Sequence, residues 1–254
     1  MAEATLKVEG LTKSLGGVVA TNNLYFEIEP GEIHAVIGPN GAGKTTLVAQ
    51  LSGMLKPDAG RILFLGRDIS GLSAEARSHL GLARSFQITS IFPKFTVLAN
   101  VAMSIQAHRG HSFRFWKPAA TNPALIEPAR KMLDDVGLGE RANMIAGNLA
   151  HGEQRQLEIA MAMATRPKLL LLDEPTAGMG EEDSARLCDF LSSLKGELTM
   201  LLIEHDMDTV FTLANRVTVL VYGKAIATGT PQEIRQNDEV KEAYLGEDDE
   251  VEHA

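Results

Sequence analysis

The sequence has few of the features that mark membrane-embedded, secreted or disulfide-bonded proteins. Its longest purely apolar run, residues 159–164, is far below the roughly 18 consecutive apolar residues that a membrane-spanning helix needs. The chain has one cysteine, Cys188, which cannot form an internal disulfide, and its first ten residues lack the basic and apolar segments of a secretory signal. These absences predict a chain that does not cross a bilayer itself and that works in the reducing cytoplasm.

Basic residues are also in short supply. The 24 Lys and Arg are outnumbered by 33 Asp and Glu, so the net charge is -9. This balance argues against nucleic acid as the main partner. With 254 residues, of which 44% are hydrophobic, we expect residues 1–254 to form a single domain, with an acidic solvated tail at about residues 247–254.

The spacing of apolar residues changes along the chain. Over the first 30 residues apolar and polar positions alternate, which predicts antiparallel strands separated by Gly16-Gly17. From about residue 73 to 146 the pattern is mostly helical, and beyond it strands and helices alternate. We expect strands at residues 61–65, 169–172, 200–203 and 217–221, and helices at residues 97–106, 125–136, 153–164, 181–194 and 207–214. The pattern predicts an α/β fold with a mostly parallel core sheet, an N-terminal antiparallel β subdomain and an inserted helical subdomain at about residues 88–165.

A glycine-rich turn lies between an expected strand at residues 33–37 and an expected helix at residues 45–55. The turn and helix start read Gly38-Pro39-Asn40-Gly41-Ala42-Gly43-Lys44-Thr45-Thr46, which matches the P-loop pattern. Its backbone N–H groups and the positive helix end suit phosphate oxygens, Lys44 suits the outer phosphates, and the Thr45 hydroxyl suits Mg²⁺. A turn that only joins a strand to a helix would not need this lysine and hydroxyl.

Two acids follow the expected strand of four leucines at residues 169–172. The strand places Asp173 at the carboxyl edge of the sheet, where the P-loop also lies. Asp173 suits the Mg²⁺ shell, and Glu174 is placed to polarise a water that attacks a phosphate. An acidic pair after a strand is often only a solvated helix cap, and the P-loop makes that interpretation the weaker one here.

The segment between these motifs resembles a known family signature. It reads Asn148-Leu149-Ala150-His151-Gly152-Glu153-Gln154-Arg155 and resembles the signature of the ABC ATPases, most of all those of branched-chain amino-acid importers. The resemblance covers nearly the whole chain and implies an ATPase of the P-loop class that uses ATP and Mg²⁺. It also implies that Gln87 reaches Mg²⁺ and that His205 contacts the γ-phosphate, so that Glu174, His205 and Gln87 form the catalytic set.

The signature predicts assembly. We expect Gly152 to open a helix running from Glu153, so that unpaired N–H groups at the helix start can bind an anion. In the resembled family the signature serves the nucleotide of a second cassette, which implies a homodimer or a heterodimer with a paralogous chain. The resemblance further implies integral-membrane permease subunits, an external solute-binding protein as an indirect partner, and a location on the inner face of the plasma membrane.

Three positions depart from the family pattern. Ala150 replaces the usual serine of the signature, and Gly180 stands where many relatives have Asp or Asn. Leu15 stands where relatives often carry an aromatic residue that stacks on adenine, so base recognition is expected to rest on apolar contact.

The transporter interpretation rests on two further segments. Residues 92–101 resemble the importer stretch that touches the permease, and residues 238–247 resemble the end of those importers and of a lipopolysaccharide-export ATPase. A soluble ATPase of iron–sulfur cluster assembly is the alternative, whereas a GTPase is disfavoured because no Asn-Lys-x-Asp guanine motif is present. The basic and aromatic residues 108–117 are interpreted as an exposed loop near the permease and lipid headgroups, not as a nucleic-acid site. The transported solute stays open among amino acids, urea and other amides.

Overall fold

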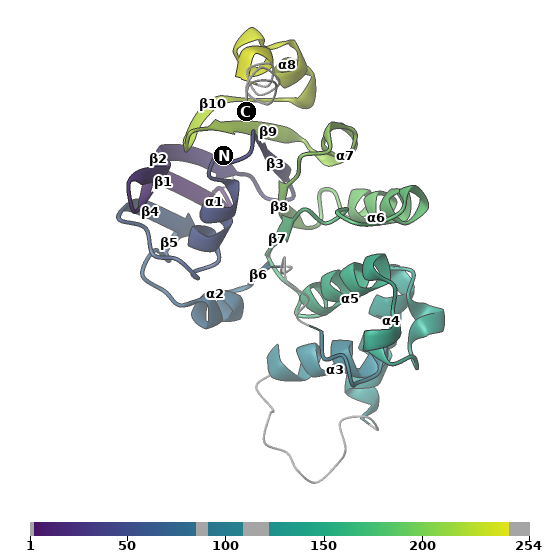
Figure 1. Ribbon diagram of the computed structural model, residues 1–254. Helices are drawn as coiled ribbons and strands as arrows, with labels where there is room; N and C mark the ends of the chain where they lie inside the picture. The colour runs from purple at the N-terminus through teal and green to yellow at the C-terminus, as the bar shows by residue number, and fades with distance from the viewer. Residues whose placement is uncertain (1–2, 85–90, 109–121, 244–254) are drawn as a thin grey trace.

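The computed structural model describes residues 3–84, 91–108 and 122–243. These residues form two β-sheets and a group of helices that lies apart from the sheets (Figure 1). The α/β fold class expected from the sequence is confirmed. Among the described residues, no helix is both long and apolar enough to span a membrane.

The first sheet is antiparallel and is built mainly from the N-terminal part of the chain. Its strand order is β2-β1-β4-β5. The strands are β1 (Leu6–Leu15), β2 (Val18–Ile28), β4 (Ala59–Phe64) and β5 (Arg67–Asp68). β1 and β2 pair as a hairpin around Gly16-Gly17, with Leu6 opposite Ile28, as the alternating pattern predicts. The strand expected at residues 61–65 is β4, and it joins this antiparallel sheet.

The second sheet is mostly parallel and has the strand order β10-β9-β3-β8-β7-β6. Its strands are β3 (Ile33–Ile37), β6 (Leu82–Arg84), β7 (Leu169–Asp173), β8 (Thr199–Ile203), β9 (Arg216–Val221) and β10 (Lys224–Gly229). Of these six strands in the described part of the chain, β10 alone runs antiparallel to its neighbour. β6 lies inside the segment expected to be mostly helical, and that expectation is therefore wrong at this point. Three residues are too few to show a periodicity, and β6 is a strand because it pairs with β7.

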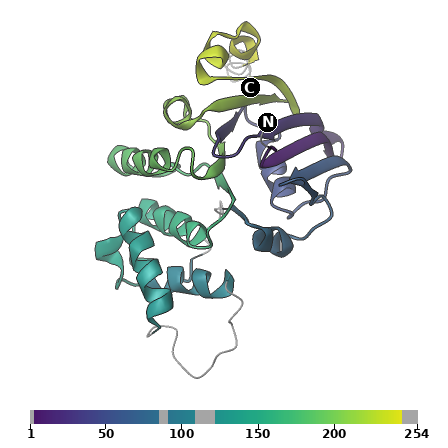
Figure 2. The ribbon, with the colours of Figure 1, turned by 180° about the vertical axis from the view of Figure 1, so that it is seen from behind.

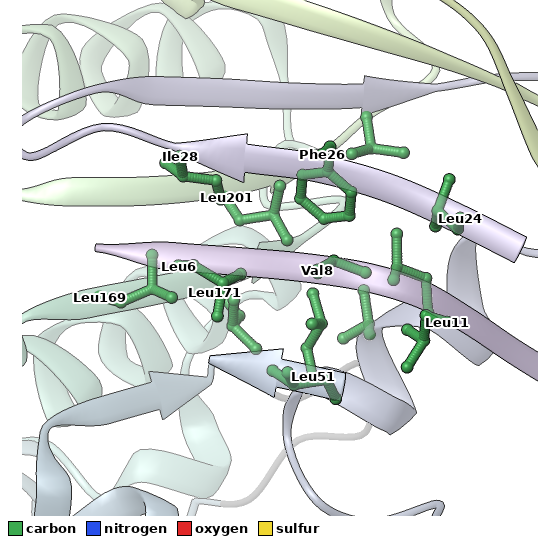
Figure 3. Packing of buried hydrophobic residues seen from close by; sticks show 14 of the residues in the cluster. Leu6, Val8, Leu11, Leu24, Phe26, Ile28, Leu51, Leu169, Leu171 and Leu201 are labelled. Carbon is green, nitrogen blue, oxygen red and sulfur yellow. The ribbon is translucent and has the colours of Figure 1, made fainter. Parts of the chain in front are cut away.

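One apolar cluster joins the two sheets. Figure 3 shows Leu6, Val8 and Phe26 of the antiparallel sheet facing Leu171 and Leu201 of the parallel sheet. Leu51 of the helix after the P-loop belongs to the same cluster. Each buried side chain of this size contributes about 1.5–3 kcal/mol, so this helix is held firmly between the sheets.

The helices lie close to their expected positions. They are α1 (Lys44–Leu51), α2 (Ala74–Leu80), α3 (Val97–His108), α4 (Pro123–Asp135), α5 (His151–Met163), α6 (Glu181–Ser193), α7 (Met207–Leu213) and α8 (Pro231–Gln236), with the short 3₁₀ turns η2 (Gly139–Arg141) and η3 (Ala146–Asn148). α1 ends four residues before its expected end because Gly53 adopts a left-handed φ of 81°, which stops a helix. The sequence pattern did not predict the strand β10 or the helix α8.

α3, α4 and α5 form a helical group with a core of its own. Val101 of α3, Leu133 of α4 and Leu157 of α5 share an apolar cluster and are fully buried. Figures 1 and 2 show the group at the end of the molecule opposite α8. α5 leads back from this group to β7, so it connects the helical part to the parallel sheet.

Candidate functional site

Three neighbouring parallel strands bring the sequence motifs together. β3, β8 and β7 are adjacent in the sheet and run in the same direction. The P-loop follows β3, His205 follows β8, and Glu174 follows β7. The structure therefore places the P-loop and both acids at one carboxyl edge, as the strand pattern predicts.

The P-loop has the backbone shape that its glycines allow. Gly43 precedes α1 with a φ of 100°, and a Cβ there would lie 2.0 Å from the carbonyl oxygen of Ala20. A side chain at this position is therefore excluded by both conformation and space. α1 begins at Lys44, one residue before its expected start, so its N-terminal N–H groups open into the loop.

The Lys44 ammonium lies over the loop itself. It donates hydrogen bonds to the carbonyl of Gly38 and, at 2.9 Å, to that of Pro39. The cation is thus held at the mouth of the loop, where the outer phosphates of a nucleotide would lie.

A pocket of about 490 Å³ opens above the P-loop. Its walls are Val18, Ala20, Gly38, Pro39, Asn40, Gly41, Ala42, Gly43, Lys44, Thr45, Thr46, Glu174 and His205. Leu15 is not among these wall residues, although it pairs with Val18 across the β1–β2 hairpin and is 49% exposed. Sequence reasoning missed Val18 and Ala20, because only the fold shows that β2 passes beside the P-loop.

Asp173 is a buried acid beside a cation that sequence reasoning also missed. The residue is 1% exposed, and a guanidinium nitrogen of Arg84 lies 3.1 Å from its Oδ2. Burial raises the pKa of the Asp173 carboxyl above its ordinary value, and the charge of Arg84 offsets part of this rise. Arg84 comes from the end of β6, so the expectation of a helical segment hid this contact.

Glu174 and His205 face each other at the pocket. The Nδ1 atom of His205 lies 3.4 Å from Oε1 of Glu174. Glu204, a buried acid beside them, accepts hydrogen bonds from the hydroxyl of Thr176 at 2.6 Å and from the backbone N–H of His205 at 3.2 Å. Glu204 thus ties the loop after β7 to the loop after β8.

The signature lies at the start of α5. The helix begins at His151 and is preceded by Ala150, so Gly152 is its second residue and does not open it as expected. The helix starts early because Glu153 accepts the backbone N–H of Ala150 at 3.0 Å. Gly152 is buried and packs against Met179, where a Cβ would lie 3.3 Å from the Met179 Cγ.

Among the described residues that line this pocket, none comes from the signature. Ala150 has no side-chain oxygen, so within the described structure its side chain accepts none of the N–H groups in the first turn of α5. The Glu153 carboxylate also pairs with Arg141 at 2.9 Å. Burial opposes ionisation of Glu153, but its contacts with Arg141 and with the Ala150 N–H outweigh burial and lower the Glu153 pKa. The N–H groups at the start of α5 are therefore suited to an anion outside this pocket.

Some predicted residues lie outside the described residues. Gln87 falls within residues 85–90, most of the basic and aromatic segment falls within residues 109–121, and the acidic tail falls within residues 244–254. The roles expected for Gln87 stay predictions.

Comparisons with known proteins agree with these motifs. A family model described as "ABC transporter" matches residues 21–177, and one described as "Branched-chain amino acid ATP-binding cassette transporter" matches residues 226–250. The chain is 40% identical to the high-affinity branched-chain amino acid transport ATP-binding protein LivG of Escherichia coli (strain K12), over 97% of this chain and 100% of the relative. It is 39% identical to BraF of Pseudomonas aeruginosa, a protein with the same description, and this match also covers 97% of this chain and 100% of the relative.

A solved structure shows the same likeness in three dimensions. The ADP conformation of an ATP-binding cassette of an ABC transporter has a TM-score of 0.84 and 29% sequence identity. The match covers 96% of this chain and 100% of that structure.

Proposed function

The chain belongs to the ATP-binding subunits of ABC transporters, ATPases whose hydrolysis of ATP is coupled to transport, and we propose that it drives an importer of branched-chain amino acids or of a related small solute. The choice of solute rests on the full-length similarity to LivG and BraF, together with the C-terminal match at residues 226–250. That match supports an importer over the alternatives of lipopolysaccharide export and iron–sulfur cluster assembly.

The P-loop binds the phosphates of ATP in this proposal. Its N–H groups and the start of α1 hold the phosphate chain, and Lys44 neutralises the outer phosphates. The Thr45 hydroxyl and the carboxylate of Asp173 are oxygen donors of the kind that Mg²⁺ prefers, and Gln87 would complete the set. When bound there, Mg²⁺ would neutralise charge on the outer phosphates.

Glu174 takes the role of general base. Its carboxylate lies at the pocket wall, where it can accept a proton from a water that attacks the γ-phosphate. His205, 3.4 Å away, contacts the γ-phosphate and holds the water in line. Glu204 positions His205 through its backbone N–H.

The signature acts on the nucleotide of a second cassette. Its residues Leu149, Ala150, His151, Gly152, Glu153 and Gln154 lie outside the pocket of their own chain. The helix start at His151 therefore serves a phosphate that a partner chain brings. Two cassettes, identical or paralogous, would enclose two ATP molecules head to tail.

An exposed apolar surface supports contact with permease subunits at the membrane. Phe92 and Phe95 are 48% and 50% exposed, and their rings meet edge to face with 6.1 Å between centroids. Ile145, also exposed, belongs to the segment paired with Thr96. Large exposed apolar side chains of this kind mark protein-binding surfaces, and these lie at the start of the helical group.

Reconstitution of the whole transporter tests this proposal. The chain is co-expressed with permease subunits and a paralogous ATPase from its own genome, and the complex is purified in lipid nanodiscs. We expect ATP hydrolysis to rise when a solute-binding protein loaded with leucine is added, and the Lys44→Ala complex to show no such rise. A chain that purifies with no membrane protein would contradict the transporter role, and stimulation by a different solute alone would contradict the choice of solute.

A further inference from the structure

Arg155 joins the signature helix to the backbone of the two acids at the pocket. It lies on α5, one turn after the helix start, and is 7% exposed. One guanidinium nitrogen, Nη2, donates to the carbonyl of Asp173 at 2.7 Å and to that of Glu174 at 3.1 Å. The helix that presents the signature is therefore hydrogen-bonded to the strand end that presents the candidate base.

The contact uses properties that only arginine has. The planar guanidinium carries several donors in fixed directions, so Nη2 can reach both carbonyls while Nη1 binds the carboxylate of Glu158 at 3.1 Å. Glu158 is buried as well, and it supplies the countercharge that a buried cation needs. A lysine at this position could not hold the same three acceptors in one plane.

The backbone that Arg155 holds is strained. Glu174 has a φ of 48°, in the left-handed region that side chains disfavour. Such a conformation persists only where the surroundings enforce it. Here the Glu174 N–H donates to Ile203 at 2.9 Å on one side, and Arg155 binds the Glu174 carbonyl on the other. The two contacts together set the direction in which the Glu174 carboxylate leaves the strand.

We propose that Arg155 is a positioning residue that couples the signature helix to the hydrolysis centre of its own chain. This inference rests on the proposed role of Glu174 as general base. In a head-to-tail pair, α5 faces the nucleotide held by the partner, so engagement of that nucleotide moves or fixes α5. Because Arg155 is hydrogen-bonded to the Glu174 carbonyl, a movement of α5 changes the position of the Glu174 backbone. Each nucleotide thereby controls hydrolysis of the other.

Two substitutions separate this role from simple stabilisation. Arg155→Met keeps the length of the side chain and removes every donor, whereas Arg155→Lys keeps the charge but not the planar fork. Arg186→Met is the matched control, because Arg186 is an exposed arginine on α6 whose side chain pairs with Asp183. For each full-length chain, affinity for a fluorescent ATP analogue, single-turnover hydrolysis, the Hill coefficient for ATP and the melting temperature are measured.

We expect Arg155→Met to bind ATP with little change and to hydrolyse it about 100-fold more slowly, the loss that a misplacement of about 1 Å can cause. Its Hill coefficient should fall towards one, because the two sites no longer communicate. The hydrolysis rate and Hill coefficient of Arg155→Lys should lie between those of Arg155→Met and the wild type. Those of Arg186→Met should match the wild type. In a Glu174→Gln background, Arg155→Met should still form the ATP-dependent dimer, since the phosphate contacts are intact.

Other outcomes overturn the inference. An Arg155→Met chain with wild-type hydrolysis and cooperativity would show that the contact has no part in catalysis. Equal losses of ATP affinity and hydrolysis in both variants, with lowered melting temperatures, would show that Arg155 only stabilises the fold. The wild-type chain distinguishes failure of this inference from failure of the proposed function. If the wild type and its partner cassette hydrolysed no ATP, the proposed function itself would be wrong, whatever the Arg155 variants did.

Discussion

Lys44 carries the main positive charge that the described residues bring to the pocket wall. Its ammonium lies on the carbonyls of Gly38 and Pro39, so the loop that receives the phosphates also holds the lysine in place. Lys44→Ala removes a charge-assisted contact that is worth about 1.5–3 kcal/mol, so we expect ATP to bind about tenfold to a hundredfold more weakly. Hydrolysis should be lost as well, because the γ-phosphate is no longer neutralised.

Titration with a fluorescent ATP analogue measures this loss. Lys224→Ala serves as the control, because Lys224 is an exposed lysine on β10 that is not part of the pocket wall. Unchanged affinity in Lys44→Ala would place the phosphate site elsewhere.

The end of the pocket that we expect to bind the base is aliphatic. Val18 lines the pocket, and Leu15 lies opposite it in the hairpin. Aliphatic side chains offer no hydrogen bond to distinguish adenine from guanine, so we expect kcat/KM for ATP and GTP to differ by no more than about tenfold, or 1.4 kcal/mol. Leu15→Tyr should tighten ATP binding, because a stacked aromatic pair is worth about 0.5–1.5 kcal/mol. A wild-type preference for ATP of several orders of magnitude would show that another residue reads the base.

At the level of the strands, a buried polar network ties β3 to its neighbours. His34 on β3 is fully buried and is joined to Glu32 at 2.9 Å and to Thr218 of β9 at 2.8 Å. Burial favours the neutral form of Glu32, but the hydrogen bonds from His34 and from the Glu29 N–H outweigh it and lower the Glu32 pKa below its ordinary value of 4.5. β3 leads directly into the P-loop, so this network anchors the strand behind the site.

The lowered pKa makes the stability of the fold depend on pH. A group whose pKa is lower in the folded state stabilises that state above its unfolded pKa, and the contribution is lost as the pH falls through the folded pKa. Glu32→Gln should therefore lower the free energy of unfolding at pH 7, and its difference from the wild type should shrink as the pH falls below 4.5. Urea unfolding at several pH values measures this, with exposed Glu27→Gln on β2 as the control. A difference that stays constant with pH would mean that the charge of Glu32 does not stabilise the fold.

At the level of the whole molecule, the proposed function links hydrolysis to assembly. Glu174→Gln keeps the size of the side chain and removes the proposed general base and its negative charge beside the expected position of the γ-phosphate. Bound ATP should therefore persist, and because ATP joins the two cassettes in the proposed head-to-tail pair, the dimer should persist with it. Light scattering with and without ATP measures the dimer, for the chain alone and for its mixture with a paralogous cassette from the same genome.

Lys44→Ala combined with Glu174→Gln is the control for this assembly, because it should lose the dimer together with ATP binding. A Glu174→Gln chain that binds ATP and stays monomeric with every partner would rule out the head-to-tail arrangement.

The sequence by itself determined the fold class and the phosphate-binding motif. Both depend on features that are local in the chain. Strand and helix periodicities repeat within a few residues, and the P-loop needs its glycines, Lys44 and Thr45 in one continuous run. For the same reason the acids Asp173 and Glu174 could be assigned to the end of a buried strand before the structure was known.

Only the tertiary structure decided which distant residues support that site. Arg84 comes from a strand too short to show a pattern, and its place beside Asp173 follows from the pairing of β6 with β7. Val18 reaches the pocket because the antiparallel sheet packs beside the P-loop, and Arg155 reaches the carbonyl of Glu174 because α5 returns to the sheet beside β7. The two side-chain contacts join residues 89 and 19 positions apart in the chain. All of these contacts form only when the sheets and helices pack together, so no local pattern could contain them.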